Sequence, residues 1–267
     1  MQTWGVQGRS EVWVGEQSGK TQDRGEVVPA TDCVVACASV APKGNKKYVA
    51  LTFDEGPSGA TKQILQVLKE KGVTATFFLS GDAAEASPAT AKAIVDAGCE
   101  IGSNSYSDDS LKGQDREAVR EQIPKGTDAI KSATGVKTML LRAPYAAFDE
   151  QNWIDAMDLV SAVVSWNIDS GDWLLNGADE QVSTVLDSVT PGNIVLLTDR
   201  DECAEQTLEA LPQIIDGLIA DGYKIVTLSD LVKTDTSLSK KLTSLTKVTM
   251  PKDAVFPQLA EDDDTTE

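Results

Sequence analysis

Residues 48–57 read Tyr-Val-Ala-Leu-Thr-Phe-Asp-Glu-Gly-Pro, a short apolar run that ends in a polar turn. The apolar part, 48–53, has the length and composition of a buried strand. An amphipathic pattern follows at 62–70, where Ile64, Leu65 and Leu68 fall on one face of a helix. A buried strand followed by an amphipathic helix is the repeating unit of parallel α/β folds.

The same alternation continues to about residue 232. Short apolar runs predict further strands at 74–79, 99–104, 138–141, 161–166, 193–197 and 224–227. Amphipathic segments predict helices at 88–97, 116–132, 151–159, 181–189 and 204–220. We expect Pro124 to interrupt the helix at 116–132, because proline lacks the amide hydrogen that a helix interior needs. This number of units leaves two architectures open, a barrel and a doubly wound sheet.

The two ends of the chain differ in composition from this middle section. Residues 1–44 are polar and glycine-rich, so we expect an N-terminal extension with one added strand near Cys33. Residues 234–267 are rich in Ser, Thr and Lys and end in an acidic run, which predicts a solvated tail that contributes little to folding. The sequence therefore predicts one α/β domain at 45–233 with polar extensions at both ends.

Charge and hydropathy exclude two classes of partner. The formal net charge of -18 over 267 residues repels phosphate backbones, so nucleic acid is not expected as a ligand. No window approaches the roughly 20 apolar residues that span a bilayer, so no membrane-spanning segment is expected. Residues 1–14 lack a basic segment that leads into an apolar stretch, and no signal peptide is expected there.

Cysteine and histidine contents limit the chemistry. The four cysteines, Cys33, Cys37, Cys99 and Cys203, are too few and too irregularly spaced for a disulfide scaffold or a zinc ribbon, and we expect them to be free. The chain contains no histidine at all. It therefore lacks the commonest metal ligand and the side chain best suited to proton transfer near neutral pH.

Polar clusters follow five of the predicted strands. They lie at 54–57, 104–108, 142–145, 169–173 and 198–200. In parallel α/β folds the carboxyl ends of the strands carry the working residues, so these clusters are expected to meet at one end of the sheet. Each cluster alone is also compatible with an ordinary turn or helix cap.

The clusters resemble the motifs of the polysaccharide deacetylases, the NodB-like domains of carbohydrate esterase family 4. Residues 51–57, Leu-Thr-Phe-Asp-Glu-Gly-Pro, are similar to the family's T-F-D-D-G-P opening, and 100–108, Glu-Ile-Gly-Ser-Asn-Ser-Tyr-Ser-Asp, to its E-I-G-x-H-[ST]-x-x-H segment. Residues 142–145, Arg-Ala-Pro-Tyr, match R-x-P-[YF]. Residues 166–173 end in the Asp-Trp of the fourth motif, and 194–198 match I-x-L-x-H except at the last position.

This resemblance covers about residues 45–233 and implies a distorted (β/α) barrel with seven or eight strands. It implies that Asp54 stands at the position of the general base and that Arg142 faces it. Asp172 stands where the family has the carboxylate that orients the acid histidine. Tyr145, Trp173 and Leu197 match positions that line the substrate cleft.

The departures from the motifs fall on the metal and acid positions. Glu55, Asn104 and Asp108 occupy the positions of the family's zinc triad, and Thr198 occupies that of the acid histidine. An all-oxygen set that includes a neutral amide suits Ca²⁺ or Mg²⁺ better than zinc. A threonine hydroxyl does not ionise in the useful pH range, so it cannot act as the acid. We therefore expect no cofactor, and a weak Ca²⁺ or Mg²⁺ site is the alternative.

These departures leave three interpretations of the function. The first is a deacetylase-like pseudoenzyme that binds a glycan of the cell wall, of chitin or of an exopolysaccharide outside the cytoplasm of a bacterium. In the second, Asp54, Arg142 and Asp172 form only a structural ion-pair network. The third is an active hydrolase, either a deacetylase with an oxygen-ligated cation or a glycosidase that uses two carboxylates such as Asp54 and Asp172, which would need to lie about 5 to 9 Å apart.

Overall fold

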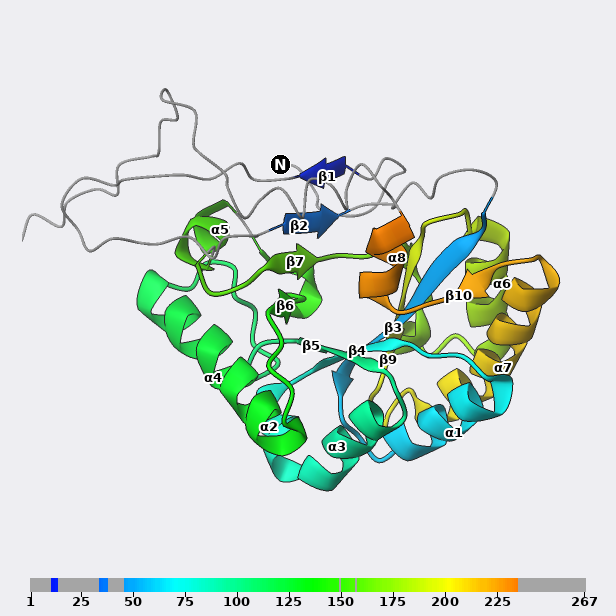
Figure 1. Cartoon of the computed structure of the whole chain (residues 1–267), viewed down its shortest axis with the longest axis horizontal. Helices are drawn as coiled ribbons and strands as arrows, with labels where there is room; N and C mark the ends of the chain where they lie inside the picture. Colours follow the sequence, from blue (N-terminus) through cyan, green and yellow to red (C-terminus); the bar gives the residue numbers. More distant parts are fainter. Residues whose placement is uncertain (1–10, 14–33, 38–45, 149, 157, 235–267) are drawn as a thin grey trace, which may run out of the picture.

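The computed structural model describes residues 11–13, 34–37, 46–148, 150–156 and 158–234, and it shows one α/β domain built around a curled sheet (Figure 1). The strands are β1 (Glu11–Trp13), β2 (Val34–Cys37), β3 (Tyr48–Gly56), β4 (Thr76–Leu79), β5 (Glu100–Ser103), β6 (Leu140–Leu141), β7 (Ala162–Val164), β8 (Ile168–Asp169), β9 (Ile194–Thr198) and β10 (Lys224–Ile225). They follow the order β1-β2-β7-β6-β5-β4-β3-β9-β8, and β10 pairs with β3. Except for the antiparallel pair β1 and β2, all pairs are parallel, which confirms the distorted barrel expected from the sequence.

Helices cover the outer face of this sheet (Figure 1). They are α1 (Thr61–Lys71), α2 (Gly81–Ala86), α3 (Pro88–Asp96), α4 (Arg116–Thr134), α5 (Glu150–Ala156), α6 (Ala178–Ser188) and α7 (Ala204–Ala220). Helix α8 (Leu228–Thr234) instead packs against the barrel interior, and the 3-10 turns are η1 (Pro144–Ala146) and η2 (Asp172–Leu174). The largest apolar cluster joins the outward side chains of β3, β4 and β9 to α1, α3, α6 and α7. Burial of this area supplies most of the stabilisation expected for the domain.

Strand β3 shows how the sequence directs side chains to the two faces of the sheet. Val49, Leu51 and Phe53 pack outward against the helices. Because side chains alternate along a strand, Ala50 and Asp54 point to the barrel interior, where Ala50 joins a second apolar cluster. The same alternation therefore buries an apolar layer against the helices and places the Asp54 carboxylate at the mouth of the barrel.

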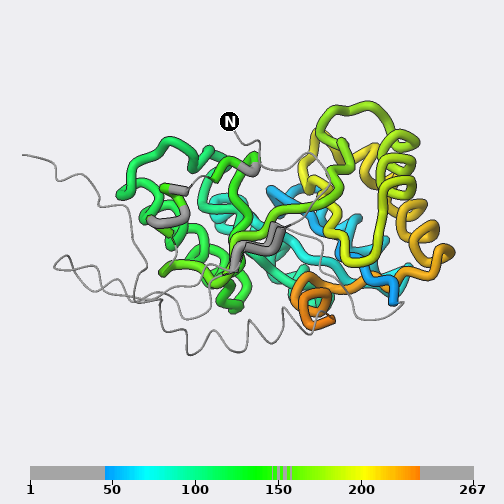
Figure 2. The backbone as a smooth tube through the Cα atoms, turned by 90° about the horizontal axis from the view of Figure 1, so that it is seen from above, coloured from blue at the N-terminus to red at the C-terminus, as the bar shows by residue number. Residues whose placement is uncertain are grey.

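Helix α8 closes the amino end of the barrel. Leu228 and Leu231 are buried in the interior cluster. The amide of Leu228 donates to Thr76 Oγ1 at the start of β4, and Ser229 donates to the Glu100 carboxylate at the start of β5. Figure 2 shows α8 on the side of the domain opposite the loop that follows β8. The carboxyl ends of the strands are thus left as the open end.

The structure departs from the sequence-based expectations at several elements. The sequence predictions lacked β1, the short strand β8, and helices α2 and α8. The expected interruption at Pro124 was wrong, because α4 runs through it. Val119, Ile123 and Ile130 are buried on both sides of the proline, and this packing offsets the missing hydrogen bond. The strand expected near Cys33 is confirmed as β2, which pairs with β7.

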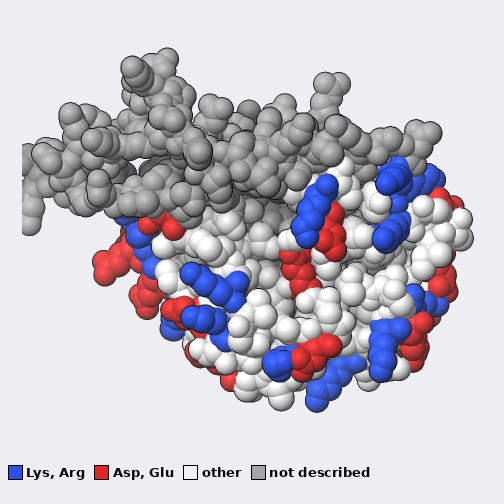
Figure 3. All heavy atoms as spheres, in the orientation of Figure 1, with Lys and Arg blue, Asp and Glu red and all other residues white. Residues whose placement is uncertain are grey.

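Other expectations concern surfaces and termini. Cys99 and Cys203 are free and buried, as expected, and Cys33 lies outside the described residues. On the face drawn in Figure 3, Lys and Arg are interspersed with Asp and Glu. Within the described ranges, no helix is both long and apolar enough to cross a bilayer. The tail expected at 234–267 lies outside the described residues, apart from Thr234 at the end of α8.

Candidate functional site

A buried ion pair lies at the mouth of the barrel. Arg142 follows β6, and its Nη1 donates to Asp54 Oδ1 at 2.6 Å and to Thr52 Oγ1 at 2.7 Å. Burial raises the pKa of Asp54 to about 6, while the adjacent Arg142 opposes the rise. A carboxylate with a pKa near 6 is ionised at neutral pH and suits the role of a general base. The structure therefore brings Asp54 and Arg142 together as the sequence predicts.

The guanidinium of Arg142 is enclosed by the barrel. Its Nε donates to the Val164 carbonyl and its Nη2 to the Ser165 carbonyl, each at 3.2 Å. It lies 4.1 Å from the ring centroid of Phe78 and 5.5 Å from that of Trp166. Only 1% of Arg142 is exposed, so this cation is held by the protein and not by solvent. Such a fixed group positions Asp54.

An irregularity in β3 places Glu55 beside this pair. The register between β3 and β4 shifts between Asp54 and Gly56, and Glu55 has φ of 72°. A residue inserted in this way interrupts the alternation of side chains between the two faces of the sheet, so its side chain is redirected. Burial, together with the nearby Asp108, raises the pKa of Glu55 to about 7, and Arg200 opposes the rise. Such left-handed conformations in residues other than glycine are concentrated at functional sites.

Arg200, in the loop after β9, joins the acidic side chains at this end of the barrel. Its Nε lies 3.0 Å from Glu55 Oε2, and its Nη2 lies 3.6 Å from Asp108 Oδ2. The Tyr145 hydroxyl donates to Asp108 Oδ2 at 2.6 Å, and this bond raises the pKa of Tyr145 to about 12. The end of β3 and the segments that follow β5, β6 and β9 thus meet near the guanidinium of Arg200.

Asn104 lies directly after β5 on the interior side of the sheet. Thr52, Thr76 and Glu100 are in register across β3, β4 and β5, and alternation along β5 turns Asn104 to the same interior face. Its Nδ2 donates to the Arg142 carbonyl at 2.9 Å. Its Oδ1 is buried and has no hydrogen-bond partner among the described residues.

Thr198, which stands at the position that the resemblance gives to an acid histidine, is part of a buried hydrogen-bond cluster. Thr198 donates to Asp172 twice, from its amide at 2.7 Å and from its hydroxyl at 2.8 Å. Thr207 Oγ1 donates a third bond to Asp172 at 3.2 Å. Asp172 has no exposed surface, and burial raises its pKa while these hydrogen bonds lower it. The carboxylate that would orient a histidine instead binds the threonine that replaces it.

We expect Asp172→Ala to destabilise the domain by about 2–4 kcal/mol, because it leaves three buried donors on Thr198 and Thr207 without an acceptor. Urea denaturation followed by circular dichroism measures this loss. Asp187→Ala, on the exposed side of α6, is the control and should change stability by less than about 0.5 kcal/mol. Equal stabilities of the two variants would contradict a structural role for Asp172.

Two aromatic side chains expected to contact a ligand are exposed at this end. Trp173 is 56% exposed, and its indole donates to Asp169 Oδ1 at 3.2 Å. Tyr145 is 62% exposed. Leu197, by contrast, is fully buried in the outer cluster with Phe53, its register partner on β3. Its side chain faces the helices, so the structure gives it no surface for a ligand and corrects its place in the expected cleft lining.

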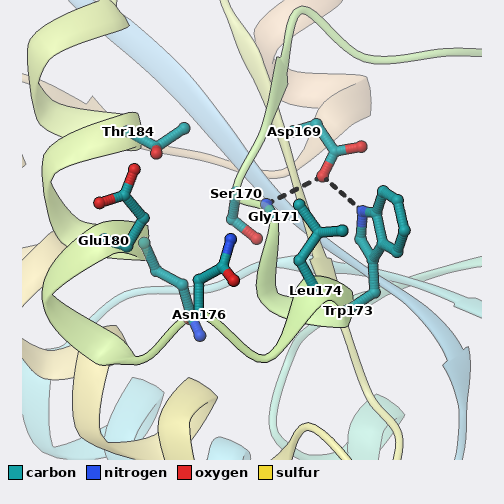
Figure 4. A pocket seen from close by; sticks show the side chains of 9 residues that line it. Asp169, Ser170, Gly171, Trp173, Leu174, Asn176, Glu180 and Thr184 are labelled. Atoms are coloured by element: carbon teal, nitrogen blue, oxygen red, sulfur yellow. Dashed lines mark hydrogen bonds between the residues drawn. The ribbon is translucent and has the colours of Figure 1, made fainter.

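A cavity of about 290 Å³ lies beside Trp173 (Figure 4). Its walls combine the apolar side chain of Leu174 with polar groups from Asn176, Glu180 and Thr184. Figure 4 shows Trp173 and Leu174 on one side of this space and Glu180 and Thr184, from α6, on the other. A pocket with apolar and polar walls suits a small polar molecule that has apolar faces and hydroxyl groups.

Comparison with known proteins agrees with this geometry. The family model for polysaccharide deacetylase matches residues 41–160. A peptidoglycan-N-acetylglucosamine deacetylase of Bacillus cereus is 33% identical over 217 residues, which cover 80% of this chain and 79% of the relative. The chain belongs to the polysaccharide deacetylase family.

Two further members bear on its function. A bifunctional xylanase/deacetylase of Pseudobutyrivibrio xylanivorans is 37% identical over 189 residues, or 70% of this chain, and the chain spans about a third (31%) of that relative. A solved structure described as a pseudoenzyme of carbohydrate esterase family 4 from Bacillus anthracis has a TM-score of 0.66 and 32% identity, covering 70% of this chain and 66% of that one. A mutant of it described as having restored enzymatic activity is 33% identical with the same TM-score, covering 70% of this chain and 68% of that one.

Members of the polysaccharide deacetylase family are generally zinc-dependent, and the residues of this chain do not fit that ion. The three equivalent positions supply two carboxylates and one neutral amide, all oxygen donors, whereas zinc favours nitrogen and sulfur ligands. Both carboxylates are already close to the guanidinium of Arg200. Among the described residues, no group of three His, Cys, Asp or Glu side chains is arranged to hold a metal ion.

Sequence reasoning gave no role to three residues that the structure places at this deacetylase-like site. Asp169 lies within the stretch that matches the fourth motif but was given no role, Arg200 lies in the cluster at 198–200 directly after the fifth motif, and Thr207 lies on α7 outside every cluster. Thr207 and Asp169 contact Asp172 and Trp173 respectively. The only sequence signal for Arg200 was a cation next to a strand end in an acidic chain.

Proposed function

We propose that residues 45–233 form a deacetylase-fold module that binds a glycan and does not deacetylate it. One observation carries the proposal. The acid position is Thr198, a residue that is only 5% exposed and whose hydroxyl donates to Asp172. This group has neither the pKa nor the freedom to protonate a leaving amine. The base, Asp54, is retained, but one half of the proton-transfer pair is missing.

The aromatic residues and the adjacent cavity support the glycan-binding half of the proposal. Sugars have apolar faces that stack on flat rings, and Trp173 and Tyr145 offer two exposed rings at the open end of the barrel. The cavity beside Trp173 is large enough for about one sugar ring and has polar walls for its hydroxyl groups. The relative from Bacillus cereus is named for peptidoglycan N-acetylglucosamine, and this supports a bacterial wall or related glycan as the ligand, met outside the cytoplasm.

The structure from Bacillus anthracis supports the non-catalytic half, because it is a solved member of the same family that is described as a pseudoenzyme. The glycosidase alternative is less well supported, because it needs two carboxyl groups that can reach the substrate. Asp172 is fully buried and already accepts three hydrogen bonds, so it is not available for that role.

The proposal is tested by measuring two properties of the purified protein. Co-sedimentation with insoluble peptidoglycan and with chitin measures binding. Acetate release from acetylated chito-oligosaccharides, with and without added zinc, manganese or calcium, measures catalysis. We expect binding to at least one glycan, no acetate above background, and no stoichiometric zinc by elemental analysis. Acetate release at an enzymatic rate would refute the proposed loss of catalysis, and failure to bind any glycan would leave only the structural ion-pair interpretation.

We expect Trp173→Ala to weaken glycan binding about tenfold or more, a loss of ~1.4 kcal/mol, because a stacking aromatic residue contributes more than most contacts. Stability should stay within about 0.5 kcal/mol, since Trp173 is more than half exposed. Ile219→Ala, which removes an apolar side chain that is 47% exposed on α7, is the matched control and should bind as the parent does. Equal binding by both variants would place the glycan elsewhere.

A further inference from the structure

Arg200 lies beside the positions that, by the motif resemblance, correspond to the family's metal ligands. Its guanidinium contacts the side chains at two of the three metal positions, with distances of 3.0 Å to Glu55 and 3.6 Å to Asp108. Its third acidic neighbour, Glu202, lies farther away at 3.8 Å and is largely exposed. Glu55 and Asp108 are only 19% and 32% exposed, so the two nearer pairs are partly shielded from water.

The third metal position, Asn104, contributes an oxygen without a charge. Its Nδ2 is fixed on the Arg142 carbonyl, which lies after β6, so its Oδ1 faces away from that strand. This oxygen is buried and unpartnered among the described residues, in an amide that is 1% exposed. The negative charge of the three positions is therefore limited to two carboxylates. A divalent cation balances that charge fully, and a single guanidinium balances half of it.

Ion pairs to Arg200 join side chains from different segments at this end. Glu55 lies at the end of β3, Asp108 lies in the loop after β5, and Arg200 lies in the loop after β9. Tyr145 joins from η1 through its hydrogen bond to Asp108. A metal ion bound by residues from several loops fixes them in the same way, so the guanidinium can supply both the charge and the cross-link.

We propose that Arg200 is a built-in counter-cation, which balances half of the charge of Glu55 and Asp108 in place of a metal ion and closes this position to divalent cations. Arg142 already balances Asp54, so removal of Arg200 leaves two neighbouring carboxylates without a cation. An all-oxygen set of two carboxylates and an amide then suits a hard ion such as Ca²⁺ or Mn²⁺. The inference rests on the proposed absence of zinc from the site and is independent of glycan binding.

The test compares melting temperatures of the full chain and of Arg200→Gln with and without millimolar CaCl₂ or MnCl₂ at constant ionic strength. The parent should melt at the same temperature in both conditions. Arg200→Gln should melt lower without metal, and either ion should raise its melting temperature by about 5 °C, because a ligand that binds only the folded state stabilises it. Isothermal titration of the same samples should show metal binding by the variant alone.

Two further variants separate this effect from general loss of an ion pair. Arg120 pairs with Asp158 at 2.6 Å with similar exposure, so Arg120→Gln should lower the melting temperature without any recovery on addition of metal. Arg200→Gln combined with Glu55→Gln and Asp108→Asn should show neither the metal-dependent rise nor metal binding.

Two outcomes overturn the inference. One is binding of calcium, manganese or zinc by the unmodified chain at one equivalent with micromolar affinity, which is measurable even if Arg200→Gln does not fold. The other is a folded Arg200→Gln that neither loses stability nor gains affinity for metal. Glycan binding by the parent, measured separately, is unaffected by either outcome, so a failure here is distinct from a failure of the proposed function.

Discussion

A variant with Glu55→Asp, Asn104→His, Asp108→His, Thr198→His and Arg200→Ala is expected to bind one zinc ion and to release acetate from acetylated chito-oligosaccharides, whereas the parent releases none. The first three changes recreate the family's zinc ligands, and the fourth returns an acid. The fifth removes the guanidinium that contacts two of the three metal positions. A rate of about 10³-fold or more above the uncatalysed background is expected, because metal and acid act together in such sites.

The scaffold already holds the partners that these changes need. Asp54 is paired with Arg142 at 2.6 Å, and Asp172 already accepts two hydrogen bonds from residue 198. A carboxylate at that place orients an imidazole and raises its pKa. Zinc content by elemental analysis and acetate by an enzymatic assay measure the outcome.

Incomplete versions of the same variant are the controls. Thr198→His alone should show no activity, and the four changes without Arg200→Ala should bind zinc more weakly than the five together. Because groups that act as a unit are far from additive, partial variants should not give proportionate partial rates. Comparable acetate release by the parent and by the complete variant would contradict this account of the site.

Arg142→Ala is expected to cost about 3–5 kcal/mol of stability, enough to unfold a domain of ordinary stability. The substitution removes a fully buried cation and leaves the Asp54 carboxylate buried without its partner. It also leaves the Val164 and Ser165 carbonyls without these donors and opens a void between Phe78 and Trp166. Denaturation midpoints in urea measure the effect.

A double substitution tests whether the cost comes from the unpaired charge. Arg142→Met with Asp54→Asn should be more stable than Arg142→Met alone, because a buried pair that is removed together leaves no isolated charge. Arg120→Gln, which removes a partly exposed ion pair between α4 and Asp158, should cost less than about 1 kcal/mol. A loss of that small size for Arg142→Ala would contradict the structural role given to the pair.

The sequence alone predicts the sheet and much of the site, because both depend on local patterns. The alternation in β3 places Asp54 on the interior side, and the same alternation in β9 turns Thr198 inward and Leu197 outward. Because side chains alternate every two residues along a strand, an inward Thr198 excludes Leu197 from the cleft. Pro124 was misjudged because packing of distant elements against α4 outweighs a local preference.

The contacts of Arg200 could not be predicted from local sequence patterns. Its partners lie at the end of β3 and in the loop after β5, more than 90 residues away in the chain, and their positions depend on left-handed backbone at Glu55 and Ser105. No local pattern encodes that pairing. The two-residue strand β8 was also missed, because two residues show no alternation, whereas the two-residue strands β6 and β10 lie within longer predicted runs.

The closure of the barrel by α8 has a practical consequence for handling the protein. Helix α8 and the start of β3 lie near the amino ends of the strands, where the Lys224 amide donates to the Lys47 carbonyl. The aromatic residues and the carboxylates lie at the other end. A fluorescent label or a biosensor surface coupled through Lys233 on α8, whose side chain is 70% exposed, would therefore leave the opposite end accessible to large, insoluble polymers.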